Sequence, residues 1–92
     1  MRVRLYPGEA PGIRTWSEES IVYSPRSGET YFLDSITTQG VLCLKRDWLD
    51  EAAYRGLLSA RLGVDDDEVM ARYVERLIKH FEESGLVEVD AS

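Results

Sequence analysis

Three short runs near the start of the chain alternate apolar and polar residues. They cover residues 13–17, 21–24 and 30–33 and are rich in Ile, Val, Thr, Tyr and Phe, which suit a pleated, half-buried surface. Pro25 presets φ at about −65° and Gly28 accepts positive φ, so the loop between the second and third runs fits a four-residue hairpin connection. The pattern predicts a three-stranded antiparallel sheet whose last strand is an open edge that another chain can pair with.

The spacing of apolar residues becomes helical after Asp34. A first helix is predicted over residues 35–45 with Asp34 as its N-cap, and Gly40 within it permits close approach of a neighbouring element. A second helix is predicted between Asp50, as its N-cap, and Gly63, as the residue that ends it.

The third helix has the clearest pattern. Asp65 is predicted as its N-cap, Glu68 completes a capping box, and Gly85 ends the helix. The apolar stripe predicted to face the core consists of Val69, Met70, Tyr73, Val74, Leu77, Ile78 and Phe81. Residues 86–89 are predicted to form a final short strand.

The two ends of the chain are predicted to lie outside this unit. Residues 1–12 contain two prolines and two glycines and are predicted to form an N-terminal arm, within which Val3 and Leu5 suit a short strand. Residues 90–92 are predicted to be a frayed C-terminal tail. We therefore expect one α+β domain over residues 13–89, in which a three-stranded antiparallel sheet is followed by three helices.

Charge is distributed unevenly along the 92 residues, whose formal net charge is −6. Residues 1–48 carry six basic and six acidic side chains, whereas residues 49–92 carry five basic and eleven acidic ones. The acidic half would repel a phosphate backbone, so a nucleic-acid partner is not expected. No apolar run approaches the roughly 18 residues that cross a bilayer, and the start lacks the apolar segment of a signal peptide, so we expect a cytoplasmic protein without a membrane partner.

Residue types that carry out chemistry are scarce. Cys43 is the only cysteine and is expected to be a small buried hydrophobe, and His80 is the only histidine, so neither a zinc site nor a histidine-based triad has its parts. The acidic run at residues 65–68 lacks the alternating ligands and central glycine of an EF-hand, and no phosphate-binding glycine loop is present. We expect no cofactor, no metal and no enzymatic activity.

Two short motifs carry a resemblance to a known family. Tyr31-Phe32-Leu33-Asp34 precedes the first helix, and Glu-Ser-Gly-Leu-Val over residues 83–87 closes the third. In this order the chain resembles the PqqD family, the small winged-helix-like domains also called precursor-peptide recognition elements, over residues 13–89. Thr37 and Val41 stand where typical members have Gly and Trp, which makes the chain more similar to the branch encoded beside relatives of the HPr serine kinase.

The resemblance implies a noncatalytic module that binds a leader or precursor peptide and presents it to a modifying enzyme. The peptide would add as a fourth strand to the third strand of the sheet and lie in the groove beside the third helix. The residues that the resemblance assigns to the strand are Glu29, Thr30, Tyr31, Phe32 and Leu33, and those assigned to the helical wall are Val69, Arg72, Tyr73, Arg76, Leu77 and His80. Arg72 and Arg76 suit an acidic leader, and they equally suit ion pairs with Glu68 and other acids.

Other functions stay open at this point. The chain could instead be an accessory subunit that docks directly on a kinase-like partner through the same edge strand. A winged-helix DNA-binding role is disfavoured by the acidic charge of the second half. A homodimer formed by edge pairing or by exchange of the arm is neither predicted nor excluded.

Overall fold

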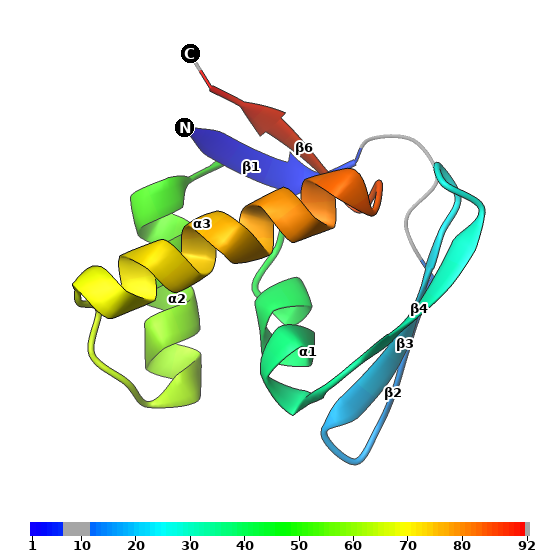
Figure 1. Cartoon of the computed structure of the whole chain (residues 1–92), viewed down its shortest axis with the longest axis horizontal. Coiled ribbons are helices and arrows are strands. Elements are labelled where there is room, and N and C mark those ends of the chain that lie inside the picture. The colour runs from blue at the N-terminus through cyan, green and yellow to red at the C-terminus, as the bar shows by residue number, and fades with distance from the viewer. Residues whose placement is uncertain (7–11, 92) are drawn as a thin grey trace.

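The computed structural model describes residues 1–6 and 12–91 and has an α+β architecture, with two small antiparallel sheets and three helices (Figure 1). The elements in chain order are β1 (Arg2–Leu5), β2 (Gly12–Trp16), β3 (Glu19–Ser24), β4 (Glu29–Leu33), α1 (Ser35–Leu42), β5 (Leu49–Asp50), α2 (Glu51–Leu62), α3 (Glu68–Glu83) and β6 (Val87–Asp90).

The predicted antiparallel meander is confirmed as the sheet β2-β3-β4. Its register places Val22 opposite Tyr31 and Ser20 opposite Leu33. The hairpin between β3 and β4 closes with the Gly28 N–H donating to the Ser24 carbonyl at 2.8 Å, and Gly28 has a φ of +74°. A glycine is needed there because other residues are strained at positive φ.

A second sheet, with strand order β5-β1-β6, corrects the prediction for both ends of the chain. Arg2–Leu5 is not part of an arm but the central strand, paired with β5 on one side and β6 on the other. Asp90, predicted to fray, is part of β6 and lies opposite Arg2. The remainder of the predicted arm, residues 7–11, lies outside the described residues, as does Ser92.

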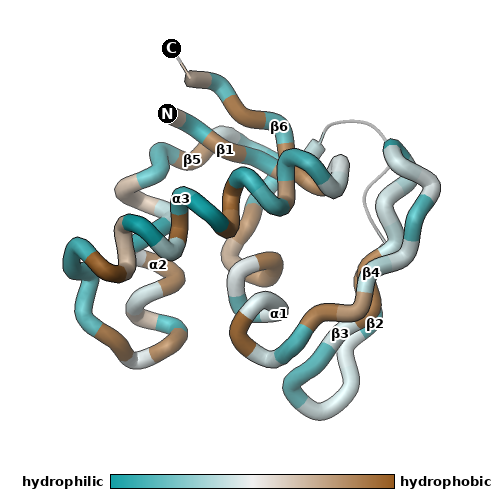
Figure 2. Tube along the Cα trace, in the orientation of Figure 1, coloured by the Kyte–Doolittle hydropathy of each residue, from teal (hydrophilic) through white to brown (hydrophobic). Residues whose placement is uncertain are grey.

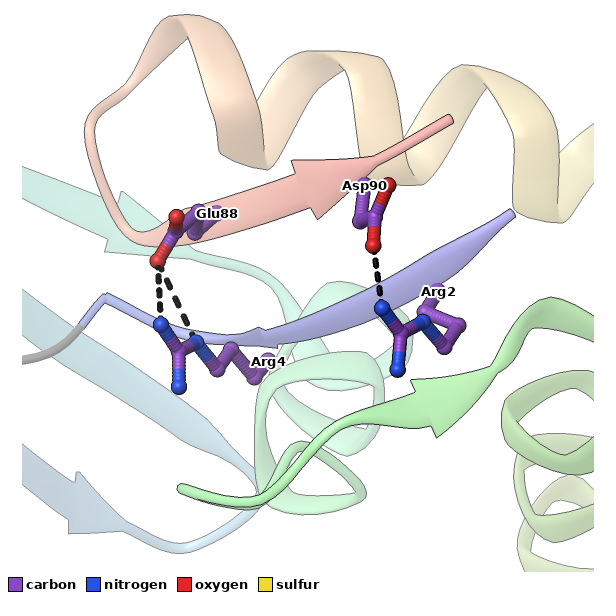
Figure 3. Close-up of polar contacts among 4 residues, drawn as sticks. All are labelled: Arg2, Arg4, Glu88 and Asp90. Atoms are coloured by element: carbon purple, nitrogen blue, oxygen red, sulfur yellow. Dashed lines mark hydrogen bonds and ion pairs between the residues drawn. The ribbon is translucent and has the colours of Figure 1, made fainter. Parts of the chain in front are cut away.

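Opposite charges line the exposed side of this second sheet. Arg4 bonds Glu88 at 2.9 and 3.2 Å, and Arg2 bonds Asp90 (Figure 3). Both guanidinium groups also lie over the Trp48 ring, at 4.3 Å for Arg4 and 5.1 Å for Arg2. Cross-strand ion pairs and cation–π contacts thus join three segments that are distant in sequence.

The first helix begins as predicted and ends three residues early. The Asp34 side chain accepts a hydrogen bond from the Thr37 N–H at 2.8 Å, which confirms the N-cap, and α1 ends at Leu42. The close approach predicted at Gly40 is also confirmed, because a Cβ built there would lie 2.7 Å from Leu77 Cδ2. The Tyr54 hydroxyl donates to the Gly40 carbonyl at 2.6 Å, which fixes α2 against α1.

The third helix begins later than predicted, because Asp67 rather than Asp65 is its N-cap. The Asp67 side chain accepts from the Met70 N–H at 3.0 Å, so the capping box expected with Glu68 does not form. The late start places Val69 in the first turn with 74% of its surface exposed, so its assignment to the core was wrong.

The rest of the predicted α3 stripe packs inward. Met70, Val74, Leu77, Ile78 and Phe81 are buried, while Tyr73 is half-buried against the same core, and Figure 2 shows hydrophobic and hydrophilic positions alternating along the helix. The predicted end is confirmed by the φ of +74° at Gly85 and by the Leu86 N–H, which donates to the Phe81 carbonyl at 3.0 Å.

None of the helices in the described part of the chain combines the length and apolarity needed to cross a bilayer. Cys43 is buried, as expected from its role as a small hydrophobe.

Candidate functional site

Strand β4 forms one open edge of the β2-β3-β4 sheet. It pairs with β3 on one side, and no other described strand pairs with it. In an antiparallel sheet, alternate residues of an edge strand direct their N–H and C=O groups away from the neighbouring strand. Part of the β4 backbone is therefore available for hydrogen bonds to an added chain.

Side chains of β4 divide between the two faces of the sheet. Leu33 is buried and Tyr31 is half-buried against the core, whereas Phe32, on the other face, is 78% exposed. Thr30 and Glu29 are exposed as well. The edge thus presents a large apolar side chain to solvent beside a partly covered tyrosine.

The α3 segment approaches the β3–β4 turn and the β4–α1 junction. The Ser24 hydroxyl, at the start of the β3–β4 turn, donates to the Gly85 carbonyl just after α3 at 3.2 Å. A side chain at Gly85 would crowd this contact, since its Cβ would lie 3.1 Å from Ser24 Oγ. Tyr73 of α3 lines a hollow together with Ile36 of α1, so it lies close to the β4–α1 junction. Burial raises the pKa of its hydroxyl, Asp34 adds to the rise and Thr37 opposes it.

The six predicted wall residues of α3 do not all share one environment. Val69, Tyr73 and Arg76 line a common hollow. His80 is exposed one turn further along the same helical face, with its ring centroid 6.0 Å from that of Phe81. Leu77 is buried under Gly40 and so belongs to the core.

The two arginines of the predicted wall have different surroundings. Arg72 forms an exposed ion pair with Glu68 at 3.0 Å, which is the alternative that the spacing had left open. Arg76 is exposed and takes part in no ion pair within residues 1–6 and 12–91. Arg76 is therefore the better placed of the two to meet an external anion.

The hollow has a volume of about 490 Å³ and lies between α1, the α2–α3 loop and the start of α3. We call it the α1–α3 hollow. Its lining consists of Ile36, Leu62, Val64, Asp65, Asp67, Val69, Met70, Tyr73 and Arg76. Three of its apolar side chains are largely exposed: Ile36 by 51%, Val64 by 51% and Val69 by 74%.

The outer face of the β2-β3-β4 sheet is a second apolar surface. Trp16, Tyr23 and Phe32 are exposed there, and Ile21 lies directly opposite Phe32 in the register. A shallow hollow of about 400 Å³ lies on the same face around Tyr23. This surface lies across the sheet from Tyr31 and Leu33, which face the core.

The described residues offer binding surfaces more than reactive groups. They contain no group of three His, Cys, Asp or Glu side chains placed to hold a metal ion. Burial raises the pKa of Cys43 and of Tyr54, and a hydrogen bond from the Thr37 backbone lowers that of Asp34, all three being consequences of packing and capping.

Comparison of the chain with protein-family models, curated proteins and solved structures finds no match.

Sequence reasoning found the edge strand but missed the α1–α3 hollow. Ile36 lies within the first predicted helix and Val64 between Gly63 and the acidic run, and neither was assigned to a surface. The available signal was Val64 itself, because an apolar residue directly between a helix-ending glycine and a run of acids is expected to be exposed.

Proposed function

We propose that this chain is a noncatalytic, PqqD-like peptide-binding module. It takes a leader or precursor peptide as a fourth strand on β4, with α3 as the neighbouring wall, and presents the peptide to a modifying enzyme. Backbone hydrogen bonds along Glu29–Leu33 would supply affinity with little dependence on sequence, and α3 side chains would supply selectivity.

The observation that carries this proposal is the open edge of β4 next to a helix that is fixed relative to it. The Ser24–Gly85 hydrogen bond ties the residue after the α3 C-cap to the β3–β4 turn, and Tyr73 of α3 lies near Asp34, directly after β4. A site held in this way loses little conformational entropy when a peptide binds.

The order of elements supports the winged-helix-like class. From α1 onward the chain runs helix, strand, helix, helix, strand, and β5 and β6 lie in one sheet on either side of β1. This order resembles that of a winged helix, with a single strand, β6, after α3 where a winged helix has a hairpin and with the amino-terminal β1 as an additional sheet strand.

Charge on α3 argues against the DNA-binding use of such a fold. Helix α3 carries four acidic and three basic side chains, and three aspartates precede it. A helix of this composition gains nothing from counterion release at a phosphate backbone.

Titration of the ¹⁵N-labelled chain with synthetic leader segments of precursor peptides encoded beside its gene tests the proposal. We expect amide shifts over Glu29–Leu33 and around Tyr73, Arg76 and His80. Shifts confined to β2 or to the β5-β1-β6 sheet would contradict it. Co-purification with a kinase-like partner, without affinity for any leader peptide, would favour the accessory-subunit function instead.

Strand addition itself is tested with two N-methylated versions of a binding peptide, one methylated at odd and one at even positions. Only alternate peptide N–H groups face β4, so one version should lose binding and the other should keep most of it. Equal effects of the two versions would indicate that the peptide does not bind as a strand.

A further inference from the structure

We propose that the α1–α3 hollow binds an apolar side chain of the same peptide, and that the peptide carries Lys or Arg beside that side chain. This inference rests on the proposed function and specifies the class of peptide. Three observations carry it: exposed apolar lining, an acidic rim and the position of the hollow beyond the end of β4.

The apolar lining is unusual for an uncovered surface. Ile36, Val64 and Val69 come from three separate segments, and each exposes half or more of its surface around one hollow. Covering such a cluster with an apolar side chain is favourable by about 25 cal/mol for each Å² removed from water. Isolated exposed apolar residues need no explanation, whereas a cluster around a hollow is typical of a binding site.

The negative charge at the rim of the hollow favours a basic residue beside the apolar side chain of the peptide. Asp65 and Asp67 line the hollow, and neither takes part in an ion pair within the described ranges. The adjacent acids are neutralised, Asp66 by Arg55 and Glu68 by Arg72. Asp67 is partly compensated by its bond from the Met70 N–H, so Asp65 is the principal free anion.

The one cation in the lining does not cancel this charge. Arg76 follows Asp67 by nine residues on α3, which places it about 13 Å further along the helix axis. Arg76 is therefore carried by a later turn of α3 than the turn that Asp67 caps. Two acids and one cation leave the lining with a negative charge, which attracts a basic peptide residue to the Asp65 rim.

The hollow lies where a peptide bound to β4 would continue. Ile36 follows the end of β4 by three residues, and Tyr73 lies near Asp34 at the same junction. A peptide added antiparallel to β4 starts at the Leu33 end, so its amino-terminal flank would pass over the hollow. The apolar anchor and its basic neighbour should then precede the strand-forming part of the peptide.

A random dodecapeptide library displayed on phage, selected on the intact 92-residue chain, tests the inference. We expect enrichment of Leu, Ile, Val, Met or Phe next to Lys or Arg, ahead of a β-branched segment. Enrichment of apolar residues next to Asp or Glu would overturn it. Selection of no peptides would overturn both this inference and the proposed function.

Matched variants tie the selected motif to the hollow. For an enriched synthetic peptide, we expect Asp65→Lys and Val69→Ser each to weaken binding about tenfold. Glu75→Lys and Leu57→Ser, which change an exposed acid and an exposed leucine outside the hollow, should change it less than twofold. All four sites are exposed, so folding is expected to persist, as circular dichroism would verify.

Amide shifts separate the two proposals. Shifts at Glu29–Leu33 with no effect of Asp65→Lys or Val69→Ser would overturn the hollow inference and leave strand addition supported. Shifts around Val64 and Val69 without any at Glu29–Leu33 would overturn the proposed function, and with it the inference that one peptide occupies both places.

Discussion

The Arg4 guanidinium and the Glu88 carboxylate lie directly opposite each other on β1 and β6, joined by hydrogen bonds of 2.9 and 3.2 Å. The pair is half-exposed, so its charge attraction alone contributes little to stability. Arg4 also covers the Trp48 ring at 4.3 Å, a contact in which Glu88 takes no part. The cation therefore contributes more to the second sheet than its anionic partner does.

From this asymmetry we expect Arg4→Ala to lower the free energy of unfolding by about 1 to 1.5 kcal/mol and Glu88→Ala by about 0.5 kcal/mol. Urea unfolding of both single variants and of the double variant, at low and high salt, measures the two contributions. Added salt should reduce the effect of Glu88→Ala more than that of Arg4→Ala. Equal losses for the two single variants would show that the Trp48 contact adds nothing.

Gly40 provides a prediction about close packing. A Cβ at this position would lie 2.7 Å from Leu77 Cδ2 and 3.2 Å from the Tyr54 hydroxyl, both in the core. Gly40→Ala should destabilise the chain by about 1 to 3 kcal/mol, although alanine favours helix by about 1 kcal/mol.

Gly56 in α2 is the matched control for Gly40, because nothing lies within 4 Å of a Cβ built there. Gly56→Ala should raise the free energy of unfolding by about 0.5 to 1 kcal/mol. Stabilisation by both substitutions, measured by urea unfolding, would mean that Leu77 moves aside at no cost.

The turns and helix ends of this fold depend on residues that are neighbours in the sequence, and these could be predicted from the sequence. The β3–β4 hairpin follows from Pro25 and Gly28, and the end of α3 follows from Gly85. The β1–β6 pairing was missed although Val3 and Val89 were each placed in candidate strands. The alternation of apolar and polar residues indicates that each segment suits a sheet. It does not indicate which segments pair, and these two lie more than eighty residues apart.

The start of α3 shows a second limit of local reasoning. Three consecutive aspartates precede the helix, and each has a side chain able to cap it. In the structure Asp67 is the residue that caps the helix, through the bond from the N–H of buried Met70, and the local sequence does not distinguish it from its two neighbours. The α1–α3 hollow was unpredictable for the same reason, because its lining comes from three segments whose proximity is set by packing.

Helix capping gives a prediction with an internal control. Asp34 and Asp50 both occupy N-cap positions, but only Asp34 accepts a side-chain hydrogen bond, from the Thr37 N–H. Asp34→Ala should cost about 1 kcal/mol and Asp50→Ala a few tenths. A similar loss for both, by thermal unfolding, would show that the capping bond is not the cause.

The Asp34 contribution should also depend on pH. The hydrogen bond from Thr37 lowers the pKa of Asp34 in the folded state, so its stabilisation is present above the ordinary pKa of about 4. It is lost as the pH falls through the lower folded value. The difference between the chain and Asp34→Ala should therefore shrink as the pH falls below about 4.

Tyr54 predicts a loss of stability at alkaline pH. Burial raises the pKa of its phenol far above the ordinary value of about 10, so above that pH the unfolded chain releases a proton that the folded chain keeps. The free energy of unfolding should then fall by up to about 1.4 kcal/mol per pH unit. Urea unfolding at neutral pH and above pH 10 measures this slope.

Removing the hydroxyl separates the two contributions of Tyr54. Tyr54→Phe should cost about 1 kcal/mol at neutral pH, through loss of the bond to the Gly40 carbonyl, and should flatten the alkaline slope. Tyr73→Phe is the comparison, because Tyr73 is only half-buried and should change the slope less. An unchanged slope in Tyr54→Phe would assign the alkaline loss to other groups.

Arg76 and Arg72 should differ in their contribution to peptide binding. Both are exposed on α3, but Arg72 is paired with Glu68 at 3.0 Å while Arg76 lines the α1–α3 hollow without an ion pair among the described residues. For a leader segment that binds β4 and carries an acidic residue beside α3, away from the basic residue expected at the Asp65 rim, Arg76→Ala should weaken affinity about threefold to tenfold, and Arg72→Ala less than twofold. Both variants should keep the unfolding free energy within about 0.5 kcal/mol, because neither side chain is buried. Isothermal titration of the two variants measures the difference, and a larger loss for Arg72→Ala would mean that the peptide breaks the Glu68 pair and lies along the other face of α3.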